Sequence, residues 1–315
     1  MKVIIAGGSG LLGRALTDRL VATGHHVVVL SRDAGSASPL VNARRVKWTP
    51  DGTAGGWASE IEGASAVVNL AGAGLADERW SDERKDELRS SRVLPTRSLV
   101  AAIRLARERP GVFLQASGVG FYGTEAGDRE MDESFPPGDD FLGQLCVAWE
   151  AEAHPVTALG CRLVLCRSGV VLTPEGGIIG RLRLPFRLFV GGPVASGSQY
   201  LSWIHLDDWL ALVMWALTTP AVSGAVNASS PMPVTNAEFS EAFARALKRP
   251  SWFRVPGFAL SIVYGEMAGA MLIRGQRAIP KRTQELGFRF EYPTLAEAMR
   301  AVVATKRTVG SSYGS

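Results

Sequence analysis

Hydrophobic and polar residues succeed one another along this chain in blocks whose lengths fit strands and helices in turn. A short apolar run at Lys2–Ala6 predicts a buried strand. After a glycine-rich stretch, Leu12, Leu16 and Leu20 recur at helical spacing with Ala15 beside them, which predicts an amphipathic helix. Another apolar run follows at once. The N-terminal sequence therefore predicts strand, turn, helix and strand in that order.

The same alternation continues through most of the chain. Further strands are predicted at His26–Leu30, Ser65–Leu70, Gly111–Ala116, Arg162–Arg167, Ser202–His205 and Ala225–Ala228. Helices are predicted at Arg84–Arg107 with an interruption near Pro95, at Phe141–Ala153, at Asp208–Leu217 and at Asn236–Leu247. Strands that alternate with helices favour a parallel sheet with helices on both faces. The pattern thus predicts the α/β class.

Two later segments depart from this pattern. Between Gly176 and Pro193, arginines, glycines and prolines mix with apolar residues, which predicts loops and short elements. Val255–Ile273 is almost entirely apolar but contains Pro256 and Glu266. A membrane-spanning helix tolerates a central carboxylate poorly. We therefore predict a buried helix that roofs a pocket, with an oligomer contact as the second interpretation.

Composition and charge narrow the class of protein. The chain has 315 residues, of which 46% are hydrophobic and 20% charged, so it can bury a proper core. The net charge of +4 is modest and no basic run exceeds two residues, which favours phosphate-bearing small molecules over nucleic acid. The three cysteines, Cys146, Cys161 and Cys166, are expected to be reduced, buried thiols. We expect a cytoplasmic protein with no signal peptide, no metal site and no membrane partner.

The glycine-rich turn after the first strand carries the clearest chemistry. Its sequence is Gly7-Gly8-Ser9-Gly10-Leu11-Leu12-Gly13, between a predicted strand and a predicted helix. In a dinucleotide-binding turn, the first glycine allows the tight bend, the second lets the pyrophosphate approach, and the third lets helix and strand pack closely. The helix N-terminus then attracts the phosphates. The predicted cofactor-binding residues here are Gly7, Ser9, Gly10, Leu11, Leu12 and Gly13.

The end of the second strand indicates which cofactor is bound. Ser31-Arg32-Asp33 follows that strand, at the place where an acidic residue would bind the ribose 2′-hydroxyl of NAD. A guanidinium can instead bind the 2′-phosphate of NADP through two hydrogen bonds. We therefore predict NADP(H), with Ser31 and Arg32 in the site. The neighbouring Asp33 weakens the prediction of NADP(H), because an acidic residue here favours NAD. The alternative for Arg32 is a solvated surface arginine.

The spacing Gly-x-x-Gly-x-x-Gly resembles the extended, epimerase-like branch of the short-chain dehydrogenase/reductase superfamily. Six further segments carry the resemblance: Val67–Gly72, Ser91–Thr96, Ala116–Gly123, Trp203–Asp208 and, at the end, Gly275–Pro280 and Gly287–Phe290. The last two look like a subgroup of sugar-nucleotide-epimerase-like proteins with a small C-terminal domain of unknown function. The resemblance implies that Leu70, Ala71, Gly72 and Arg92 also contact the cofactor.

The fold and its division follow from the pattern and the resemblance together. We expect a Rossmann-type doubly wound parallel sheet with a smaller C-terminal α+β substrate region. The expected units are an NAD(P)-binding domain over 1–230 with substrate-region insertions at about 176–200, a cap domain over 231–300, and a flexible tail over 301–315. A homodimer is an open possibility for its assembly.

The catalytic pair of the superfamily is missing. That pair is Tyr-x-x-x-Lys on one helix, where the lysine lowers the tyrosine pKa. None of the five tyrosines has a lysine four residues later. If Glu150 aligns with the acidic residue that often follows the lysine, Leu142 and Cys146 occupy the positions of the pair. Neither side chain can replace it. Glu150 itself is equally compatible with a solvated helix face.

Ser117 and Tyr122 remain as candidate catalytic residues. The resemblance implies that Ser117 lies beside the nicotinamide and hydrogen-bonds the substrate oxygen. Tyr122 follows closely and is either a proton donor or a packing residue, with an ordered water as the other donor. We interpret His205 as structural, with Asp207 or Asp208 as the cap of the next helix. Residues in the variable half are the candidates for substrate binding: Gln199, Trp203 and Gln276.

Two functions from different classes fit these residues. The first is an NADP(H)-dependent, epimerase-like oxidoreductase for a small carbonyl or hydroxyl compound, a nucleotide-linked sugar being one candidate. The second is an NADP(H)-binding regulator or scaffold that lost catalysis together with the Tyr/Lys pair. Some relatives carry a cell-division-inhibitor label, which is consistent with the second function.

Overall fold

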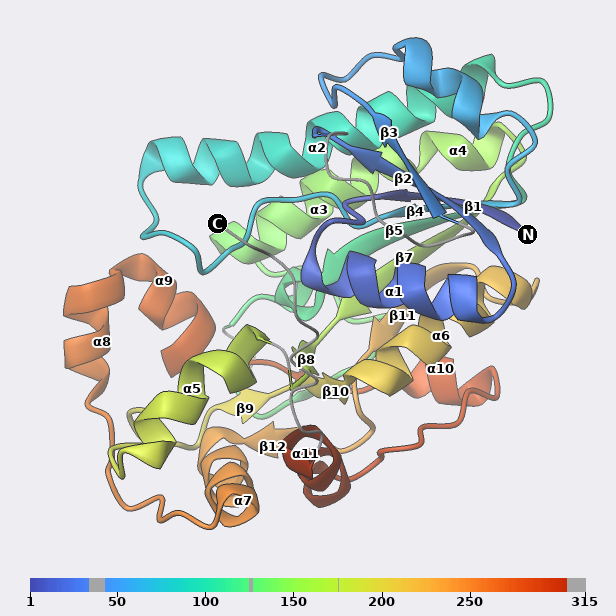
Figure 1. The fold of residues 1–315 in the computed structure, drawn as a ribbon. Coiled ribbons are helices and arrows are strands. Elements are labelled where there is room, and N and C mark those ends of the chain that lie inside the picture. Colours follow the sequence, from blue (N-terminus) through green and yellow to red (C-terminus); the bar gives the residue numbers. More distant parts are fainter. Residues whose placement is uncertain (34–42, 125–126, 175, 305–315) are drawn as a thin grey trace, which may run out of the picture.

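A seven-stranded parallel sheet forms the centre of the molecule (Figure 1). The computed structural model describes residues 1–33, 43–124, 127–174 and 176–304. The strand order is β11-β7-β5-β4-β1-β2-β3. From β1 the chain adds β2 and β3 on one side and then β4, β5, β7 and β11 on the other, so the order of strands reverses between β1 and β4. The strands are β1 (Lys2–Ala6), β2 (His26–Ser31), β3 (Ala43–Lys47), β4 (Ala66–Asn69), β5 (Val112–Gly118), β7 (Arg162–Ser168) and β11 (Gly224–Ala228).

Helices cover both faces of this sheet, as Figure 1 shows. They are α1 (Leu11–Ala22) and α6 (Leu206–Thr218) on one face, and α2 (Asp82–Leu105), α3 (Phe141–Ala153) and α4 (Pro155–Ala158) on the other. Successive side chains of β1 point to opposite faces, so Ile5 packs with Leu16 and Trp209 while Ile4 packs with Leu99. Both faces are therefore buried, as in other parallel sheets. The predicted Rossmann-type doubly wound sheet is confirmed.

The predicted interruption of the long helix near Pro95 is wrong, because α2 runs through this proline. Proline removes one backbone hydrogen bond from a helix and crowds the preceding turn. Leu88 lies before Pro95 and Leu99 after it, and both side chains are fully buried. Pro95 is buried as well. We infer that tertiary packing along the whole helix outweighs the local cost of the proline.

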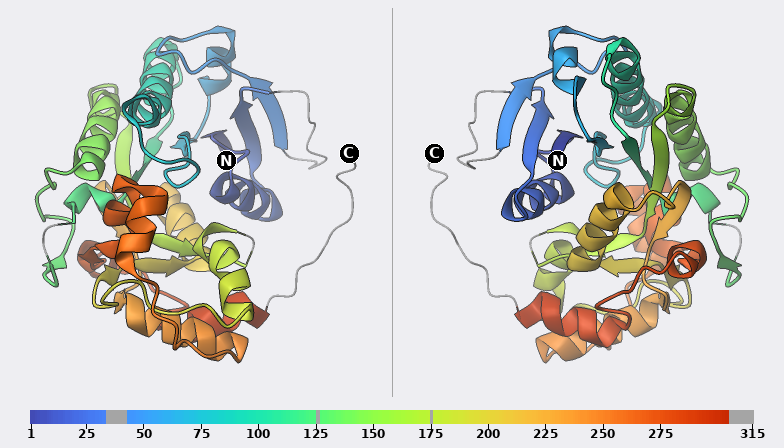
Figure 2. Two further views of the ribbon diagram at one scale, coloured as in Figure 1. Left: turned by 90° about the vertical axis from the view of Figure 1, so that its left-hand side faces the viewer. Right: turned by 90° about the vertical axis from the view of Figure 1, so that its right-hand side faces the viewer.

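A second, smaller region packs beside the sheet and gathers residues from two parts of the chain. Its core includes Leu172, Phe186 and Trp203 together with Phe243 and Met299. In both views of Figure 2, its helices α5, α7 and α11 lie together below the blue N-terminal half. The helices and short strands are α5 (Gly177–Arg187), α7 (Asn236–Leu247), α10 (Lys281–Glu285), α11 (Leu295–Ala304), β6 (Glu130–Met131), β8 (Val170–Leu172), β9 (Tyr200–Leu201), β10 (Trp203–His205), β12 (Val234–Thr235) and β13 (Arg277–Ala278).

Residues 177–187 were predicted as loops and short elements, and this prediction is wrong. They form α5, whose buried side chains Ile179 and Phe186 contact the core described above. The arginines between these apolar residues concealed the helical period, and Pro185 is a helix breaker in isolation. The predicted tail from residue 301 also differs, since α11 extends to Ala304. Residues 305–315 lie outside the described part.

The buried helix predicted for Val255–Ile273 is also wrong in its first half. That half forms α8 (Gly257–Tyr264), which has no buried residue. The chain bends at Gly265 (φ +62°) and continues as α9 (Glu266–Ala268) and a π-helical turn (Gly269–Ile273). In α9, Met267 and Ala268 are buried. Burial predicted from hydrophobicity is therefore correct only in the part of the segment that a second surface covers.

His205 and Asp208 tie the C-terminal chain to the sheet. His205 is the N-cap of α6, and its Nδ1 accepts a hydrogen bond from the Asp207 backbone N–H (3.2 Å). The predicted Asp207 or Asp208 cap is thus wrong, although His205 has the structural role expected. The Asp208 carboxylate instead accepts the backbone N–H groups of Glu291 (2.7 Å) and Tyr292 (3.0 Å). Asp208 is only 2% exposed, so this contact leaves little room for replacement by water.

We predict that Asp208→Ala lowers the free energy of unfolding by about 2–4 kcal/mol, because it leaves two backbone N–H groups without acceptors. Asp207 provides a matched control, since its 41%-exposed side chain makes a surface ion pair with Arg19. Asp207→Ala should cost at most about 1 kcal/mol. Urea unfolding followed by circular dichroism measures both, and equal losses would contradict the role given to Asp208.

Candidate functional site

The glycine turn after β1 touches the end of β4 through the backbone alone. Gly7 has φ +79°, and a Cβ added there would lie 2.6 Å from the Leu70 carbonyl carbon and 2.8 Å from the Ala71 nitrogen. A Cβ on Gly13 would lie 2.3 Å from the Gly7 carbonyl oxygen. A Cβ on Gly10 would meet only that oxygen, at 3.4 Å. Gly7 and Gly13 are thus required by packing, whereas Gly10 leaves open space.

The open position is also the start of a helix. Gly10 is the N-cap of α1 and has extended backbone angles. Ser9 and Gly10 are exposed, and Leu11 and Leu12 are half-buried. The Arg14 guanidinium donates to the Ser9 carbonyl oxygen (2.7 Å), which holds the turn against the helix. A helix N-terminus beside an open glycine at the reversal point of a parallel sheet is a site suited to a phosphate.

The predicted discriminator lies at the end of β2. Ser31 is 8% exposed, and its hydroxyl donates to the Asp33 carbonyl oxygen (2.7 Å). Arg32 and Asp33 are exposed. This hydrogen bond fixes the turn that leaves the strand, so the Arg32 side chain starts from a defined backbone position at the carboxyl edge of the sheet.

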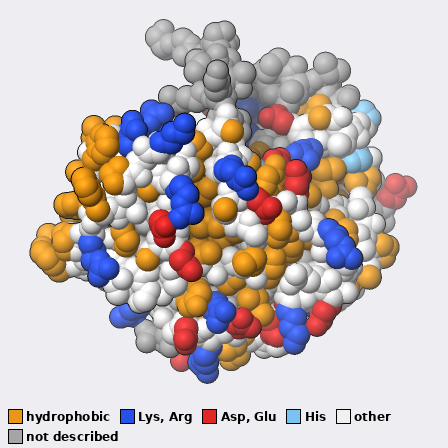
Figure 3. Space-filling model, turned by 90° about the horizontal axis from the view of Figure 1, so that it is seen from below, with side chains coloured by type: hydrophobic (Ala, Val, Ile, Leu, Met, Phe, Trp, Pro, Cys, Tyr) orange, Lys and Arg blue, Asp and Glu red, His pale blue; other side chains and the backbone are white. Residues whose placement is uncertain are grey.

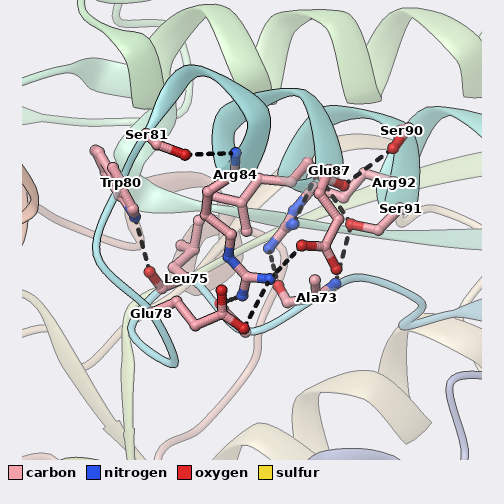
Figure 4. Close-up of polar contacts among 12 residues, drawn as sticks. Ala73, Leu75, Glu78, Trp80, Ser81, Arg84, Glu87, Ser90, Ser91 and Arg92 are labelled. Carbon is pink, nitrogen blue, oxygen red and sulfur yellow. Dashed lines mark hydrogen bonds and ion pairs between the residues drawn. The ribbon is translucent and has the colours of Figure 1, made fainter.

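Two arginines of α2 hold the loop that follows β4, as Figure 4 shows. Arg92 donates to the carbonyl oxygens of Leu88 (2.9 Å) and Ala73 (3.0 Å). Arg84 donates to the Gly74 carbonyl oxygen (2.7 Å) and pairs with Glu87. Burial lowers the pKa of Arg92 to about 10. Arg92 therefore lies behind Gly72 and supports the loop from the helix side.

The helix face that carries Tyr and Lys in the superfamily carries Leu142 and Cys146 here, followed by Glu150. Leu142 packs with Trp80 and Met267 in a hydrophobic cluster. Cys146 is buried, and its Sγ lies 3.8 Å from the Gly118 carbonyl oxygen. Burial raises the pKa of Cys146 to about 11, so the side chain is a neutral thiol near neutral pH. Neither residue at the positions of the pair is suited to proton transfer.

Glu150, one helical turn further on, contacts Ser117 directly. The Ser117 hydroxyl donates to Glu150 Oε1 (2.6 Å). Arg167 on β7 donates to both oxygens of the same carboxylate, each at 2.9 Å. Ser117, Glu150 and Arg167 are 6%, 5% and 5% exposed. The alternative of a solvated face for Glu150 is therefore wrong. The four-residue spacing from Cys146 was the signal that could have placed it in the site.

These contacts determine whether Ser117 can donate a hydrogen bond to a ligand or accept one from it. Both oxygens of the Glu150 carboxylate accept hydrogen bonds from Arg167, and a carboxylate paired with a guanidinium only accepts hydrogen bonds. The hydroxyl hydrogen of Ser117 is committed to that carboxylate. Its oxygen therefore presents lone pairs to any other partner. Ser117 is arranged to accept a hydrogen bond from a ligand hydroxyl group.

Tyr122 is placed in the same buried network. It is 2% exposed, and its hydroxyl donates to Asn227 Oδ1 (2.7 Å). The same oxygen accepts a hydrogen bond from Arg167 (3.3 Å). Burial raises the pKa of Tyr122 to about 12, so the phenol stays protonated near neutral pH. Its hydrogen is donated to Asn227, so side chains join the turn after β5 to β7 and β11.

The three residues predicted to line a substrate site lie in different surroundings. Trp203 is fully buried, and its ring N–H donates to the Met232 carbonyl oxygen (3.0 Å). The Gln199 amide donates to the carbonyl oxygens of Val194 and Leu272. Its Oε1 atom is buried without a hydrogen-bond partner. Gln276 is half-buried, and its backbone carbonyl oxygen accepts a hydrogen bond from the Ser202 hydroxyl (2.8 Å).

No group of three His, Cys, Asp or Glu side chains among the described residues is placed to hold a metal ion. No helix in the described ranges is both long and apolar enough to cross a membrane.

Comparison with known sequences gives matches along nearly the whole chain. Residues 3–228 match the NAD dependent epimerase/dehydratase family, and residues 255–302 match a domain of unknown function, DUF1731. Epimerase family protein Mb2239 of Mycobacterium bovis is 42% identical over 298 residues, which cover 94% of this chain and 96% of that protein. Human epimerase family protein SDR39U1 is 37% identical over 307 residues, covering 96% and 100%.

Solved structures agree with these matches. The crystal structure of human SDR39U1 (isoform 2) with NADPH has a TM-score of 0.87 and 35% identity, over 97% of this chain and 100% of that one. A nucleoside-diphosphate sugar epimerase from Corynebacterium glutamicum has a TM-score of 0.77 and 31% identity, over 96% of this chain and 58% of that one.

We predict that Gly13→Ala and Gly10→Ala differ sharply in stability. Gly13→Ala forces a backbone shift and should lower the free energy of unfolding by about 1–3 kcal/mol. Gly10→Ala meets open space and should change it by less than about 0.5 kcal/mol. Urea unfolding of both variants checks this. Equal losses would mean that Gly13 is not held against Gly7 as described.

Proposed function

Because the chain belongs to the NAD dependent epimerase/dehydratase family, we propose that it binds NADPH and acts on a small carbonyl or hydroxyl compound. The observation that carries the proposal is the backbone contact between the two strand ends at the reversal point of the sheet. There, Gly7 lies against Leu70 and Ala71 while Gly10 stays open. Dinucleotides bind at this point of a doubly wound sheet.

Different residues around the reversal point bind different parts of the cofactor. The N-terminus of α1, from Ser9 to Gly13, receives the pyrophosphate. Leu70–Gly72, supported from behind by Arg92, lies where a ribose passes close to the backbone. Arg32 is in place for a 2′-phosphate, which favours NADPH over NADH. The human relative at 35% identity was crystallised with NADPH, which supports this choice.

The chemical part of the proposal rests on Ser117. When bound, the reduced cofactor NADPH would supply a hydride, and the oxidised form NADP⁺ would accept one. Ser117 orients the reacting oxygen by accepting a hydrogen bond from a substrate hydroxyl group. Glu150 and Arg167 hold that serine in its acceptor state. A bound water exchanges the proton, since the Tyr122 hydroxyl is committed to Asn227.

A nucleotide-linked sugar is the substrate class that we favour. It carries several hydroxyl groups, any of which can donate a hydrogen bond to Ser117. The Corynebacterium glutamicum structure at 31% identity is described as a nucleoside-diphosphate sugar epimerase, which supports this class.

The alternative function is an NADPH-binding regulator or scaffold without turnover. Leu142 and Cys146 favour it, since both are buried at the positions of the missing pair. Binding of NADPH with no turnover against a panel of carbonyl compounds and nucleotide sugars would support the regulator. Turnover of any member of the panel would exclude it.

We predict that Arg32→Ala weakens NADPH binding by about 1.5–3 kcal/mol, because it removes a charge-assisted contact to the 2′-phosphate. NADH affinity should barely change. Fluorescence titration with each cofactor measures the two constants. Arg19→Ala is the control, since Arg19 pairs with Asp207 at the other end of α1.

Equal losses for NADPH and NADH in Arg32→Ala would show that Arg32 does not read the 2′-phosphate. Gly10→Val in the same titration should abolish binding of both cofactors, because a branched side chain would occupy the approach of the pyrophosphate. Normal binding by Gly10→Val would place the phosphates elsewhere.

We predict that Ser117→Ala lowers kcat/KM about 10²–10³-fold on whichever substrate of the panel is turned over, with NADPH affinity unchanged. Stopped-flow oxidation of NADPH provides the measurement. Tyr122→Phe keeps the ring and should retain most of the turnover if water exchanges the proton. A loss of about 10²–10⁴-fold in Tyr122→Phe would instead identify the phenol as the general acid.

A further inference from the structure

Large hydrophobic side chains are exposed on one side of the smaller region. Trp252, Phe258 and Ile262 are 78%, 72% and 70% exposed. We call the whole set the α5–α8 surface, because its members lie in these two helices or in the segments that follow α5 and precede α8. Its members are Leu184, Leu188, Phe189, Val190, Trp252, Phe253, Phe258, Ile262, Val263 and Tyr264.

Backbone contacts join the segments that carry this surface. A parallel bridge links Val194 to Val255, and Ala195 N–H donates to the Val255 carbonyl oxygen (2.9 Å). The Trp252 ring N–H donates to the Phe189 carbonyl oxygen (3.4 Å). Figure 3 shows hydrophobic side chains gathered along the left-hand edge, where α8 lies in Figure 1, with Lys and Arg side chains between them. The side chains thus form one surface rather than isolated residues, which indicates an interaction site.

The two segments that carry this surface contain charged residues of one sign only. Residues 176–195 and 248–264 contain no Asp or Glu, and their basic residues are Arg181, Arg183, Arg187, Lys248, Arg249 and Arg254. Of these, Arg181, Arg187, Lys248, Arg249 and Arg254 are exposed, and Arg181 forms an ion pair with Asp77. The Arg249 guanidinium lies 5.1 Å from the centre of the Phe189 ring, so cation and hydrophobic group occupy the same surface.

This charge bears on which partner fits. In a two-fold dimer the same surface meets itself, so the basic residues of one copy would face those of the other. Like charges brought together in this way oppose association. A surface with aromatic and aliphatic side chains among Lys and Arg is instead suited to the interface of a membrane that carries negative lipids.

We propose that the α5–α8 surface docks the protein onto an anionic lipid bilayer without crossing it. Trp252, Phe253 and Phe258 enter the boundary between headgroups and acyl chains, where aromatic side chains are favoured. Arg187 and Arg254 contact the headgroup phosphates. The helix α8 has 8 residues, far fewer than the about 20 that a spanning helix needs.

This proposal is independent of the proposed enzymatic function. It differs from the expectation that the protein has no membrane partner, and the exposure of α8 is the observation that motivates it.

Vesicle flotation of the full chain tests the proposal. The vesicles are neutral phosphatidylcholine, or phosphatidylcholine with about one third phosphatidylglycerol. We expect at least about tenfold stronger binding to the anionic vesicles at low salt, falling as salt is raised, because several basic residues act together. Absence of binding to the anionic vesicles at low salt would overturn the proposal.

Two variant pairs separate the hydrophobic from the electrostatic part. Trp252→Ser with Phe258→Ser removes exposed ring area, and Arg249→Glu with Arg254→Glu reverses the charge; each pair should weaken binding about tenfold or more. Leu105→Ser with Arg104→Glu is the matched control on α2, where both residues are exposed. The control should bind like the unaltered protein. Circular dichroism confirms that each variant is folded.

Three results would overturn the proposal at this stage. Binding unaffected by either variant pair would place the lipid contact elsewhere. An equal loss in the control would indicate a general effect of charge. A concentration-dependent dimer that Phe258→Ser dissociates, without vesicle binding by the unaltered protein, would identify a second copy of this chain as the partner.

Discussion

The contact between two strand ends, made without side chains, is the constraint on which the rest of the structure depends. Gly7 can lie against the Leu70 carbonyl group only because it has no Cβ and adopts a positive φ. This closeness brings the turn after β1 and the loop after β4 to one point. It also directs α1 so that its N-terminus opens at the same edge of the sheet. The glycine turn and the Leu70–Ala71 backbone, both expected to bind the cofactor, therefore lie side by side.

The loss of the Tyr/Lys pair accompanies a different arrangement of charge on α3. The lysine position is a buried, neutral thiol, and the next turn of the helix carries Glu150 instead. A carboxylate buried without a cation would be costly, and Arg167 on β7 supplies that cation through two hydrogen bonds. Ser117 is consequently an acceptor and Tyr122 a buried donor to Asn227. The chemistry that we propose for this site is therefore hydroxyl recognition by Ser117 rather than proton transfer by a phenol.

The smaller region shows how the same kind of sequence can end in opposite environments. Ile179 and Phe186 of α5 pack with the apolar residues of α7 and form a core, whereas α8, which ends just before Gly265, has no buried residue. Because the chain then returns through Met267 to pack against α2 and α3, the exposed helix is anchored at its end beside the candidate site. The cationic residues beside α8 give that exposed surface a definite electrostatic character.

The sequence by itself determined the features that single residue types impose over short distances. The glycine turn, the periodic strands and helices around it, and the family resemblance all followed from such local signals, and the fold and the family are confirmed. Tertiary structure decided what depends on distant partners. Tyr122 and Asn227 are 105 residues apart, and no local pattern connects them. The same holds for Glu150 with Arg167, for the packing that carries α2 through Pro95, and for the helix α5. Burial of Val255–Ile273 was mispredicted for the same physical reason: hydrophobicity is a property of the segment, whereas burial requires a second surface to cover it.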